Sequence, residues 1–233
     1  MPPKVLYFDL GMVLVEFSHA RMCAQMGEVA GVSAEAVRAA IFENEDAQAA
    51  LWRFETGHIT ADEFFDYFCR ATRSSPDRAR LTHSVCDIFA PIEPMWELVR
   101  RLAAAGQTMA ILSNTNPLQW QHMTDGRFPL LARIGEPGSP FAWAILSYEI
   151  HSMKPDRAIF DAAIERAGVA AHDIFFVDDR LENVEGARAV GIDAVQFHHC
   201  DSLIADLRQR GVRGACYQEQ PCGLSFAGCG RAC

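Results

Sequence analysis

The chain has 233 residues, apolar residues at half of its positions and a formal net charge of −9. This length suits one α/β domain with an insertion or two small domains, and either could bury a substantial core. The acidic balance argues against a nucleic-acid-binding surface, and no apolar run approaches the roughly 20 residues of a membrane-spanning helix. With no secretory signal pattern at the N-terminus, we expect a cytoplasmic protein.

The first predicted element is the apolar strand VLYFDL at 5–10, which carries a single carboxylate, Asp9. About 75 residues without a strand signal follow, and their apolar spacing is typical of helices. Two helix starts are marked, because Ser33 is a candidate N-cap and Thr60 with Glu63 has the spacing of a capping box. We therefore expect residues 16–90 to form a helical cap inserted after the first strand.

Beyond the insert, strand and helix patterns alternate. Helical patterns at 94–106, 155–168 and 182–191 each end on a glycine. Four further strands are mostly continuous apolar runs, which is typical of parallel strands covered on both faces. The alternation predicts an α/β fold with a doubly wound parallel sheet. These strands are TMAILS at 108–113, AWAILS at 142–147, DIFFVD at 173–178 and DAVQF at 193–197.

The last segment, residues 215–233, is rich in Cys and Gly and shows no periodicity, so we expect it to be disordered or only loosely packed. Its four cysteines lack the spacing of structural zinc sites, which leaves adventitious cysteines or a metal or redox site as alternatives. The predicted catalytic core therefore comprises residues 1–15 and 91–214.

Polar side chains follow four of the predicted strands, where ligands bind in a doubly wound sheet. Each of them alone has an ordinary explanation as a helix cap, a turn residue or a solvated side chain. Their joint placement at the carboxyl ends of separate strands favours a single site. The residues are Asp9, Ser113, Asn114, Lys154, Asp178 and Asp179.

Three carboxylates at one place repel one another and require a cation. Oxygen ligands favour Mg²⁺, which also takes water and a substrate phosphate. Lys154 and the metal would neutralise the phosphate, while Ser113 and Asn114 would donate hydrogen bonds to its oxygens. Asp9 would then be the nucleophile that forms an aspartyl-phosphate.

Four segments together resemble the motifs of the haloacid dehalogenase superfamily of hydrolases. They are FDLG at 8–11, LSNTN at 112–116, KPD at 154–156 and VDDRLENVEGA at 177–187. The resemblance reaches to about residue 210 and implies a Rossmann-like core with a helical C1 cap. FDLG is also similar to the first motif of the bacterial α-D-glucose-1-phosphate phosphatase-like group.

The resemblance implies a role for each motif residue. Asp9 would be a metal ligand as well as the nucleophile, and Asp179 would be a direct ligand. Asp178 would lie beside it and act directly or through water. The backbone carbonyl of Gly11 would be a further ligand, and Asn183 would order the acidic loop.

Gly11 departs from the superfamily pattern, because most of its phosphatases carry an Asp there that protonates the leaving group. Gly11 keeps the carbonyl but lacks this acid, and general acid–base catalysis typically contributes about 10²–10⁴-fold. We therefore expect a slower enzyme, or one whose substrate or water supplies the proton. A sugar 1-phosphate would soften the loss, since its anomeric oxygen leaves more readily than an ordinary alkoxide.

The sequence thus favours a Mg²⁺-dependent phosphatase that acts on a small phosphate monoester, with a sugar phosphate as the preferred substrate. A 2-haloacid dehalogenase is one alternative, although the dehalogenases of the family carry small polar residues in place of Asp178 and Asp179. A protein that binds a phosphorylated ligand without turnover is the other. The expected partner is a small phosphorylated metabolite rather than a nucleic acid or a membrane, and nothing in the sequence indicates the oligomeric state.

Overall fold

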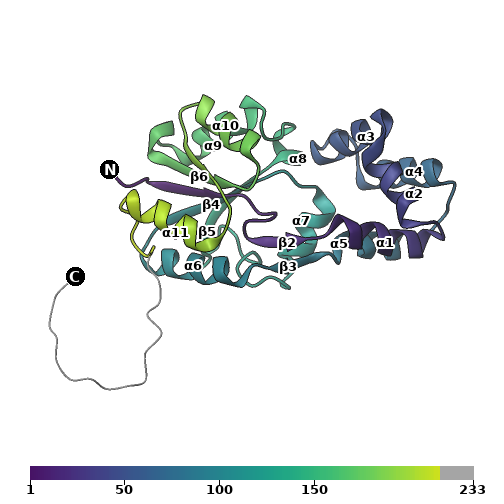
Figure 1. Ribbon diagram of the computed structural model, residues 1–233, viewed down its shortest axis with the longest axis horizontal. Helices are drawn as coiled ribbons and strands as arrows, with labels where there is room; N and C mark the ends of the chain where they lie inside the picture. Colours follow the sequence, from purple (N-terminus) through teal and green to yellow (C-terminus); the bar gives the residue numbers. More distant parts are fainter. Residues whose placement is uncertain (216–233) are drawn as a thin grey trace, which may run out of the picture.

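The computed structural model describes residues 1–215, so nearly all of the predicted tail lies outside the described residues. Five strands form one sheet in the order β5-β4-β1-β6-β7, and every neighbouring pair is parallel (Figure 1). This arrangement confirms the doubly wound α/β fold. The strands are β1 (Val5–Phe8), β4 (Thr108–Ser113), β5 (Phe141–Leu146), β6 (Ile174–Asp178) and β7 (Asp193–Gln196).

Helices cover both faces of this sheet (Figure 1). One face packs against α6 (Glu93–Ala104) and α11 (Cys200–Gln209), and the other against α9 (Arg157–Ala167) and α10 (Leu181–Ala189). No helix within residues 1–215 is both long and apolar enough to cross a membrane. The shorter helices of this part are α7 (Pro117–Thr124), α8 (Ser147–Ile150) and the 3₁₀ turn η2 (Ala171–Asp173).

Successive residues of β1 face opposite helix layers. Leu6 and Phe8 belong to the apolar cluster on the α6 and α11 side, whereas Val5 and Tyr7 belong to the cluster on the α9 and α10 side. All four side chains are buried. This two-sided burial explains why the strand is continuously apolar rather than alternating.

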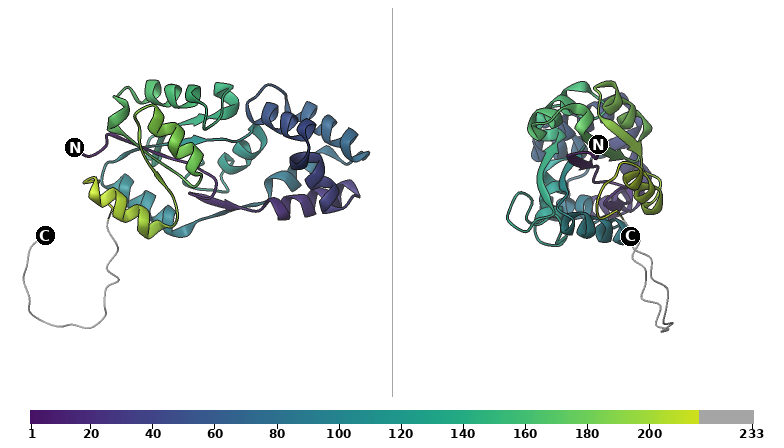
Figure 2. Two further views of the ribbon diagram at one scale, coloured as in Figure 1. Left: turned by 45° about the horizontal axis from the view of Figure 1, so that its top comes forward. Right: turned by 90° about the vertical axis from the view of Figure 1, so that its left-hand side faces the viewer.

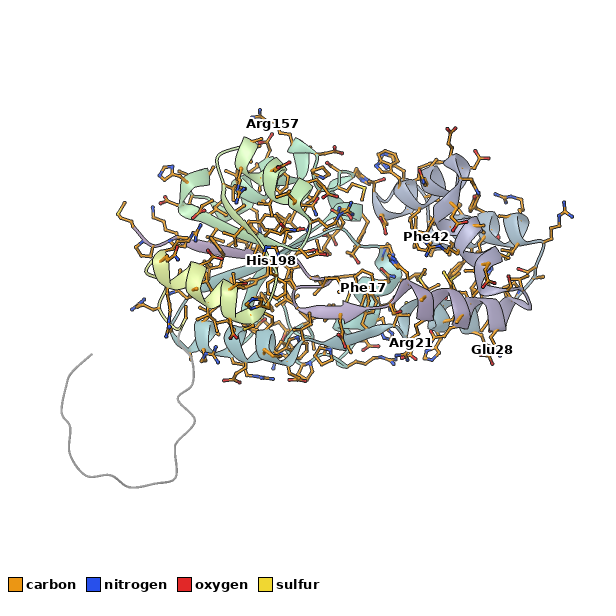
Figure 3. The ribbon with its side chains drawn as sticks, in the orientation of Figure 1. Phe17, Arg21, Glu28, Phe42, Arg157 and His198 are labelled. Carbon is orange, nitrogen blue, oxygen red and sulfur yellow. The ribbon has the colours of Figure 1, made fainter. Side chains whose placement is uncertain are left out.

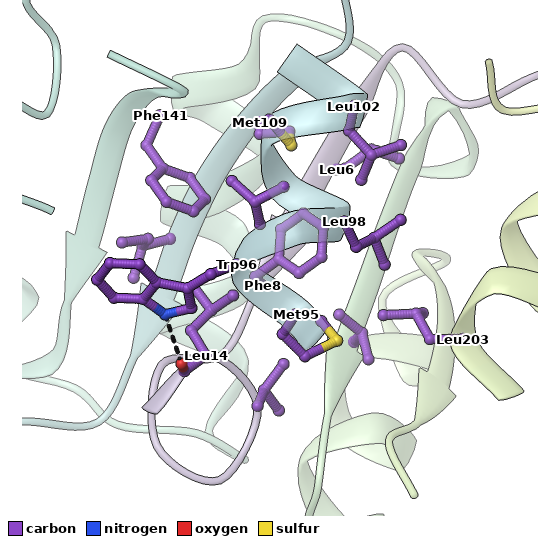
Figure 4. Packing of buried hydrophobic residues seen from close by; sticks show 14 of the residues in the cluster. Leu6, Phe8, Leu14, Met95, Trp96, Leu98, Leu102, Met109, Phe141 and Leu203 are labelled. Atoms are coloured by element: carbon purple, nitrogen blue, oxygen red, sulfur yellow. Dashed lines mark hydrogen bonds between the residues drawn. The ribbon is translucent and has the colours of Figure 1, made fainter. Parts of the chain in front are cut away.

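The first of these clusters also fixes the loop that follows β1 (Figure 4). Trp96 on α6 packs among its buried side chains, and its Nε1 donates a hydrogen bond of 2.8 Å to the Leu14 carbonyl. The same carbonyl accepts a bond of 3.0 Å from the backbone N–H of Ile92. The loop that carries Asp9 and Gly11 is therefore held against α6.

Between β1 and α6 the chain leaves the sheet and forms a helical insert beyond the carboxyl ends of the strands (Figure 2). The insert encloses an apolar cluster of its own. Its elements are α1 (His19–Ala30), α2 (Ala34–Arg38), the π-helical turn η1 (Ala39–Glu43), α3 (Glu45–Glu55), α4 (Ala61–Thr72) and α5 (Arg78–Cys86).

Both predicted helix starts in the insert are confirmed. The Ser33 hydroxyl accepts a hydrogen bond from the backbone N–H of Ala36 at the start of α2. At the start of α4, Thr60 and Glu63 form the full capping box, in which each side chain accepts from the other residue's backbone N–H.

The prediction that this stretch contains no strand is wrong. Two short strands, β2 (Val15–Phe17) and β3 (Phe89–Pro91), pair in antiparallel fashion at the two ends of the insert. Strands of three residues are too short to show an alternating pattern. The pair joins the insert to the sheet domain.

Candidate active site

The predicted charged residues meet at the carboxyl edge of the sheet. Carboxylate oxygens of Asp9, Asp178 and Asp179 lie within 4.8 Å of one another. The Lys154 Nζ lies 2.9 Å from Asp9 Oδ1 and 2.6 Å from Asp178 Oδ2. Because β1 and β6 are neighbouring parallel strands, residues that follow or end them necessarily reach the same edge.

Lys154 is a buried cation with every donor satisfied. Besides the two carboxylates, its Nζ donates to the Leu112 carbonyl at 2.9 Å, which uses all three N–H groups of the ammonium. Burial alone would lower the pKa of Lys154, but the Asp9 and Asp178 carboxylates outweigh it and hold this pKa above its ordinary value. Lys154 is therefore charged at neutral pH and serves as the counter-ion of both carboxylates.

The Asp9 carboxylate is buried and held in one orientation. Its Oδ1 accepts hydrogen bonds from the Leu10 backbone N–H at 2.7 Å and from Lys154. Burial raises the pKa of Asp9 to about 7, while the Lys154 ammonium opposes this shift and the Asp178 carboxylate adds to it. A bound cation would favour the ionised form of Asp9, which is the form that can act as a nucleophile.

The adjacent residues Asp178 and Asp179 differ in whether their carboxylate oxygens are available to bind a ligand. Both oxygens of the fully buried Asp178 are occupied, by Lys154, by the Arg180 backbone N–H and by the Asn183 side-chain amide. Asp179 is only partly buried, and burial followed by repulsion from Asp178 raises its pKa. Asp179 is therefore the carboxylate of this loop that is better placed to bind a cation directly.

The donor set fits a hard divalent cation. It consists of carboxylate oxygens, which Mg²⁺ and Ca²⁺ prefer. A buried amide oxygen nearby, Oδ1 of Asn183, has no hydrogen-bond partner among the described residues. Gly11 lies two residues beyond Asp9, in a turn closed by a 2.9 Å hydrogen bond from the Val15 N–H to the Leu10 carbonyl.

Asn114 does something that the sequence did not indicate. Its Nδ2 donates to the Lys154 carbonyl and its Oδ1 accepts from the Lys154 backbone N–H, each at 2.8 Å. The Asn114 side chain thus positions Lys154. Only the second Nδ2 hydrogen of Asn114 and the backbone would remain to bind a phosphate. The neighbouring Ser113 hydroxyl is buried and makes only a long contact of 3.4 Å, so it can turn toward another acceptor.

Gly11 lies beside an aromatic ring that restricts the space for a side chain at this position. A Cβ placed on Gly11 would lie 2.8 Å from Cε1 of Phe17. Phe17 belongs to β2 and packs against Phe89 of β3, with their ring centroids 5.9 Å apart. The absence of a side chain at Gly11 is therefore coupled to the packing of the β2–β3 pair.

A cavity of about 110 Å³ opens beside these residues and extends into the insert. Glu55, at the end of α3, lines it together with Gly11 and Ser113. Burial raises the pKa of Glu55 to about 7, against the effect of the Arg180 guanidinium. Sequence analysis missed Glu55, because a charged residue at a helix end usually has only a structural role.

The insert contacts the sheet domain close to this cavity. The Ser147 hydroxyl, at the start of α8, donates to the Glu55 carbonyl at 2.6 Å. Gly57 has φ +69°, and a Cβ there would lie 2.2 Å from the Tyr148 carbonyl oxygen. Only glycine permits this close approach of the two backbones. Gly57 is therefore a signal in the sequence for the contact between the insert and the sheet domain.

Sequence comparison identifies curated relatives of this chain. Flavin mononucleotide hydrolase 1 of Arabidopsis thaliana is 28% identical over 163 residues, which cover 70% of this chain and 62% of the relative. The sesquiterpene phosphatase astK of Aspergillus oryzae is 38% identical over 61 residues, 26% of this chain and 30% of that protein. The chain thus spans less than two thirds of the length of these curated relatives.

The fold is shared with a solved structure that carries ligands. A haloacid dehalogenase family enzyme of Bacteroides thetaiotaomicron, in complex with magnesium and inorganic phosphate, superposes with a TM-score of 0.66. The two are 25% identical, and the alignment covers 84% of this chain and 94% of that one. A family model for haloacid dehalogenase-like hydrolases matches residues 21–191. Because that match covers most of the chain, the protein belongs to the haloacid dehalogenase-like hydrolases.

Proposed function

We propose that this protein is a Mg²⁺-dependent phosphatase that hydrolyses a small phosphate monoester through an aspartyl-phosphate on Asp9. The observation that carries the proposal is the buried Lys154 between Asp9 and Asp178, with Asp179 at the rim. Two curated relatives are named as a hydrolase of flavin mononucleotide and as a sesquiterpene phosphatase, which supports phosphate ester hydrolysis.

The residues present would divide the work as follows. Asp9, Asp179 and the Gly11 carbonyl would hold Mg²⁺, with Asp178 orienting the loop or acting through water. The bound metal would supply positive charge beside the phosphate. Asp9 would attack phosphorus as the bond to the leaving oxygen breaks, and that oxygen would take a proton from water or from the substrate, since Gly11 carries no acid. A second water would then attack the aspartyl-phosphate, which releases phosphate and regenerates Asp9.

The remaining polar groups would stabilise the phosphate during transfer. Lys154 would balance the charge on Asp9 and on the phosphate oxygens. The Ser113 hydroxyl would donate to one of these oxygens, and Asn114 would contribute its remaining donors while it holds the Lys154 backbone in place. Asn183 would keep Asp178 oriented toward Lys154.

We further propose that residues 16–90 act as a C1 cap over a core made of residues 1–15 and 91–214. The separate apolar cluster of the insert and the narrow β2–β3 connection support movement of the insert as a unit. Closure would exclude water during phosphoryl transfer and reopening would admit it. The likeness to glucose-1-phosphate phosphatases and a cytoplasmic location stay predictions. A sugar phosphate substrate is also a prediction, and the mostly apolar cavity beside the site argues against it.

The two alternatives make different demands on the site. A metal-free dehalogenase has no need of Asp179 beside Asp9, whereas their closeness suits a cation. A binding protein without turnover would not need a nucleophile that Lys154 holds in place. Both observations favour the phosphatase.

Removal of the metal tests the proposal. We expect release of p-nitrophenol from p-nitrophenyl phosphate to require Mg²⁺ and to stop in EDTA. Asp179→Asn should weaken the apparent affinity for Mg²⁺ by about 10–100-fold, because a carboxylate ligand becomes a neutral amide. The matched control is Asp161→Asn on the exposed side of α9, which should leave the Mg²⁺ titration unchanged.

Other results would contradict the metal site or favour one of the two alternative functions. Full activity in EDTA would contradict the metal site, and chloride release from 2-chloropropionate without Mg²⁺ would favour the dehalogenase. If pure protein releases no p-nitrophenol yet binds phosphate esters tightly, the binding protein is favoured.

The Gly11 position gives a second test. Gly11→Asp alone should lower activity, because its Cβ would press on the Phe17 ring. In Gly11→Asp/Phe17→Ala the acid gains space, so hydrolysis of an alkyl phosphate should be at least about 10-fold faster than in the single variant, since general acid catalysis can contribute about 10²–10⁴-fold. Phe17→Ala alone is the control. Equal rates for the single and double variants would show that the Phe17 ring does not prevent an acid at position 11 from acting in catalysis.

A further inference from the structure

The cavity beside the phosphate site has a mostly apolar lining. Its near end is formed by Leu10, Gly11 and Ser113 of the sheet domain. From there it runs between β2, α1, η1, α3 and α4 of the insert. Figure 3 shows Phe17 on the side of the sheet domain and Phe42 farther into the insert. Aromatic and aliphatic side chains dominate its wall, among them Phe17, Met22, Phe42, Leu51, Phe54 and Phe64.

We propose that this cavity holds the organic part of the substrate, and that the substrate is the phosphate monoester of an apolar alcohol. The inference rests on the proposed phosphatase function and narrows its substrate class. A group that leaves water for an apolar wall gains binding free energy in proportion to its own apolar area. A hydroxyl-rich group gains nothing there and loses its hydrogen bonds to water.

Two of the polar residues of the cavity wall are bonded to each other. Asn116 caps α7 by accepting from the Gln119 backbone N–H at 3.1 Å, and its Nδ2 donates to the Gln119 side-chain oxygen at 3.0 Å. The His19 ring packs between Phe17 and Phe42, with centroid distances of 5.0 and 4.8 Å. These contacts occupy Asn116 and the faces of the His19 ring, which reduces the hydrogen bonding that the wall offers to the several hydroxyls of a sugar.

The two titratable groups of the cavity wall differ in their charge at neutral pH. Partial burial lowers the pKa of His19, and the Arg38 guanidinium lowers it further, which favours a neutral imidazole. Burial raises the pKa of Glu55 to about 7, with Arg180 opposing. The cavity wall therefore carries little charge apart from a partly ionised Glu55.

The size of the cavity limits the group. Its volume of about 110 Å³ is somewhat smaller than the apolar cavity of about 150 Å³ that binds benzene in an engineered protein. One ring or a branched alkyl group of similar size matches this space when it is attached to a phosphate at the sheet edge. A longer chain would require the insert to move outward.

Non-hydrolysable phosphonates test the inference without relying on turnover. The full-length protein with Mg²⁺ is titrated in a calorimeter with methylphosphonate, benzylphosphonate and 2,3-dihydroxypropylphosphonate. We expect benzylphosphonate to bind at least about 30-fold more tightly than methylphosphonate, as burial of one ring in an apolar site predicts. The dihydroxypropyl compound should gain less than about 3-fold. Benzyl and methyl compounds of equal affinity, or a tighter dihydroxypropyl compound, would overturn the inference.

A variant locates the binding in this cavity. Phe42→Asn should reduce the benzyl-to-methyl affinity ratio by about 10-fold while the affinity for methylphosphonate stays the same. The matched control is Tyr67→Asn, also in the insert but outside the cavity wall, which should preserve the ratio. If Phe42→Asn does not fold, Leu51→Asn on α3 takes its place. An unchanged ratio in a folded cavity variant would contradict the proposal.

Measurements of hydrolysis distinguish a failure of this inference from a failure of the proposed function. Tight binding of benzylphosphonate without hydrolysis of benzyl phosphate would mean that the phosphatase is wrong and the apolar site is right. Mg²⁺-dependent hydrolysis of p-nitrophenyl phosphate, combined with equal affinities for the benzyl and methyl compounds, would mean the reverse.

Discussion

Asp9→Asn is expected to lower kcat for p-nitrophenyl phosphate by more than about 10³-fold, because an amide cannot form the aspartyl-phosphate. The substitution preserves size and can still accept the Leu10 N–H hydrogen bond that fixes Oδ1. Binding of phosphonates in the presence of Mg²⁺ should weaken far less than kcat. The comparison of turnover with binding isolates the nucleophile from the metal site.

The control for this variant is Asp173→Asn. Asp173 precedes β6 at the opposite edge of the sheet, where its carboxylate accepts a 2.8 Å hydrogen bond from the exposed Lys4. Activity should stay within about 2-fold of the wild type, because Asp173 lies at the end of the sheet opposite to the site. If Asp9→Asn kept more than a tenth of the wild-type kcat, covalent catalysis by Asp9 would be excluded.

Lys154→Met should cost both activity and stability. The ammonium is buried and bonds to two carboxylates, so its removal leaves Asp9 and Asp178 facing each other without a counter-ion. Removal of one partner from a buried ion pair typically costs about 3–5 kcal/mol. We expect a loss of this order in the free energy of unfolding at pH 8, measured with urea in EDTA, and no measurable turnover.

The loss of stability should depend on pH in a defined direction. Burial already raises the pKa of Asp9, and loss of Lys154 would raise it further. A carboxyl whose pKa is higher in the folded state binds more protons there, so the variant loses stability as pH rises. The deficit relative to the wild type should therefore be smaller at pH 5 than at pH 8.

Two comparisons complete this test. Lys4→Met removes an exposed lysine from Asp173 and should change the free energy of unfolding by less than about 1 kcal/mol. Mg²⁺ should restore part of the stability of Lys154→Met, because it brings positive charge back to the carboxylates. A deficit that is the same at pH 5 and pH 8 would contradict the role of Lys154 as a counter-ion.

Local sequence patterns predicted much of the fold correctly. The five sheet strands are continuous apolar runs because both faces of the sheet are covered, as Leu6 and Tyr7 on opposite faces of β1 illustrate. The helix starts at Ser33 and Thr60 were also predictable, since capping depends on residues at most three positions apart. The β2–β3 pair was missed because its strands pair across the whole insert and are too short for a pattern.

The same distinction between local patterns and distant contacts applies to the candidate site. Strand ends predicted that Asp9, Lys154 and Asp179 would share one edge of the sheet. The pairing of the Asn114 side chain with the Lys154 backbone joins residues 40 positions apart and has no local signal. The contact between Gly11 and Phe17 likewise depends on where β2 lies after the loop has turned.

By itself, the sequence determined which chemical groups this protein brings to the carboxyl edge of its sheet, since parallel strands deliver the residues at their ends to one place. Only the tertiary structure decided how those groups divide their roles, with Lys154 saturated, Asp178 fully bonded and Asp179 accessible. It also decided that the space beside Gly11 is apolar, because residues from β2, η1 and α3 meet there only after the insert has folded over the site. Burial and hydrogen bonding depend on such distant contacts, whereas strand and helix patterns depend on neighbours in the chain.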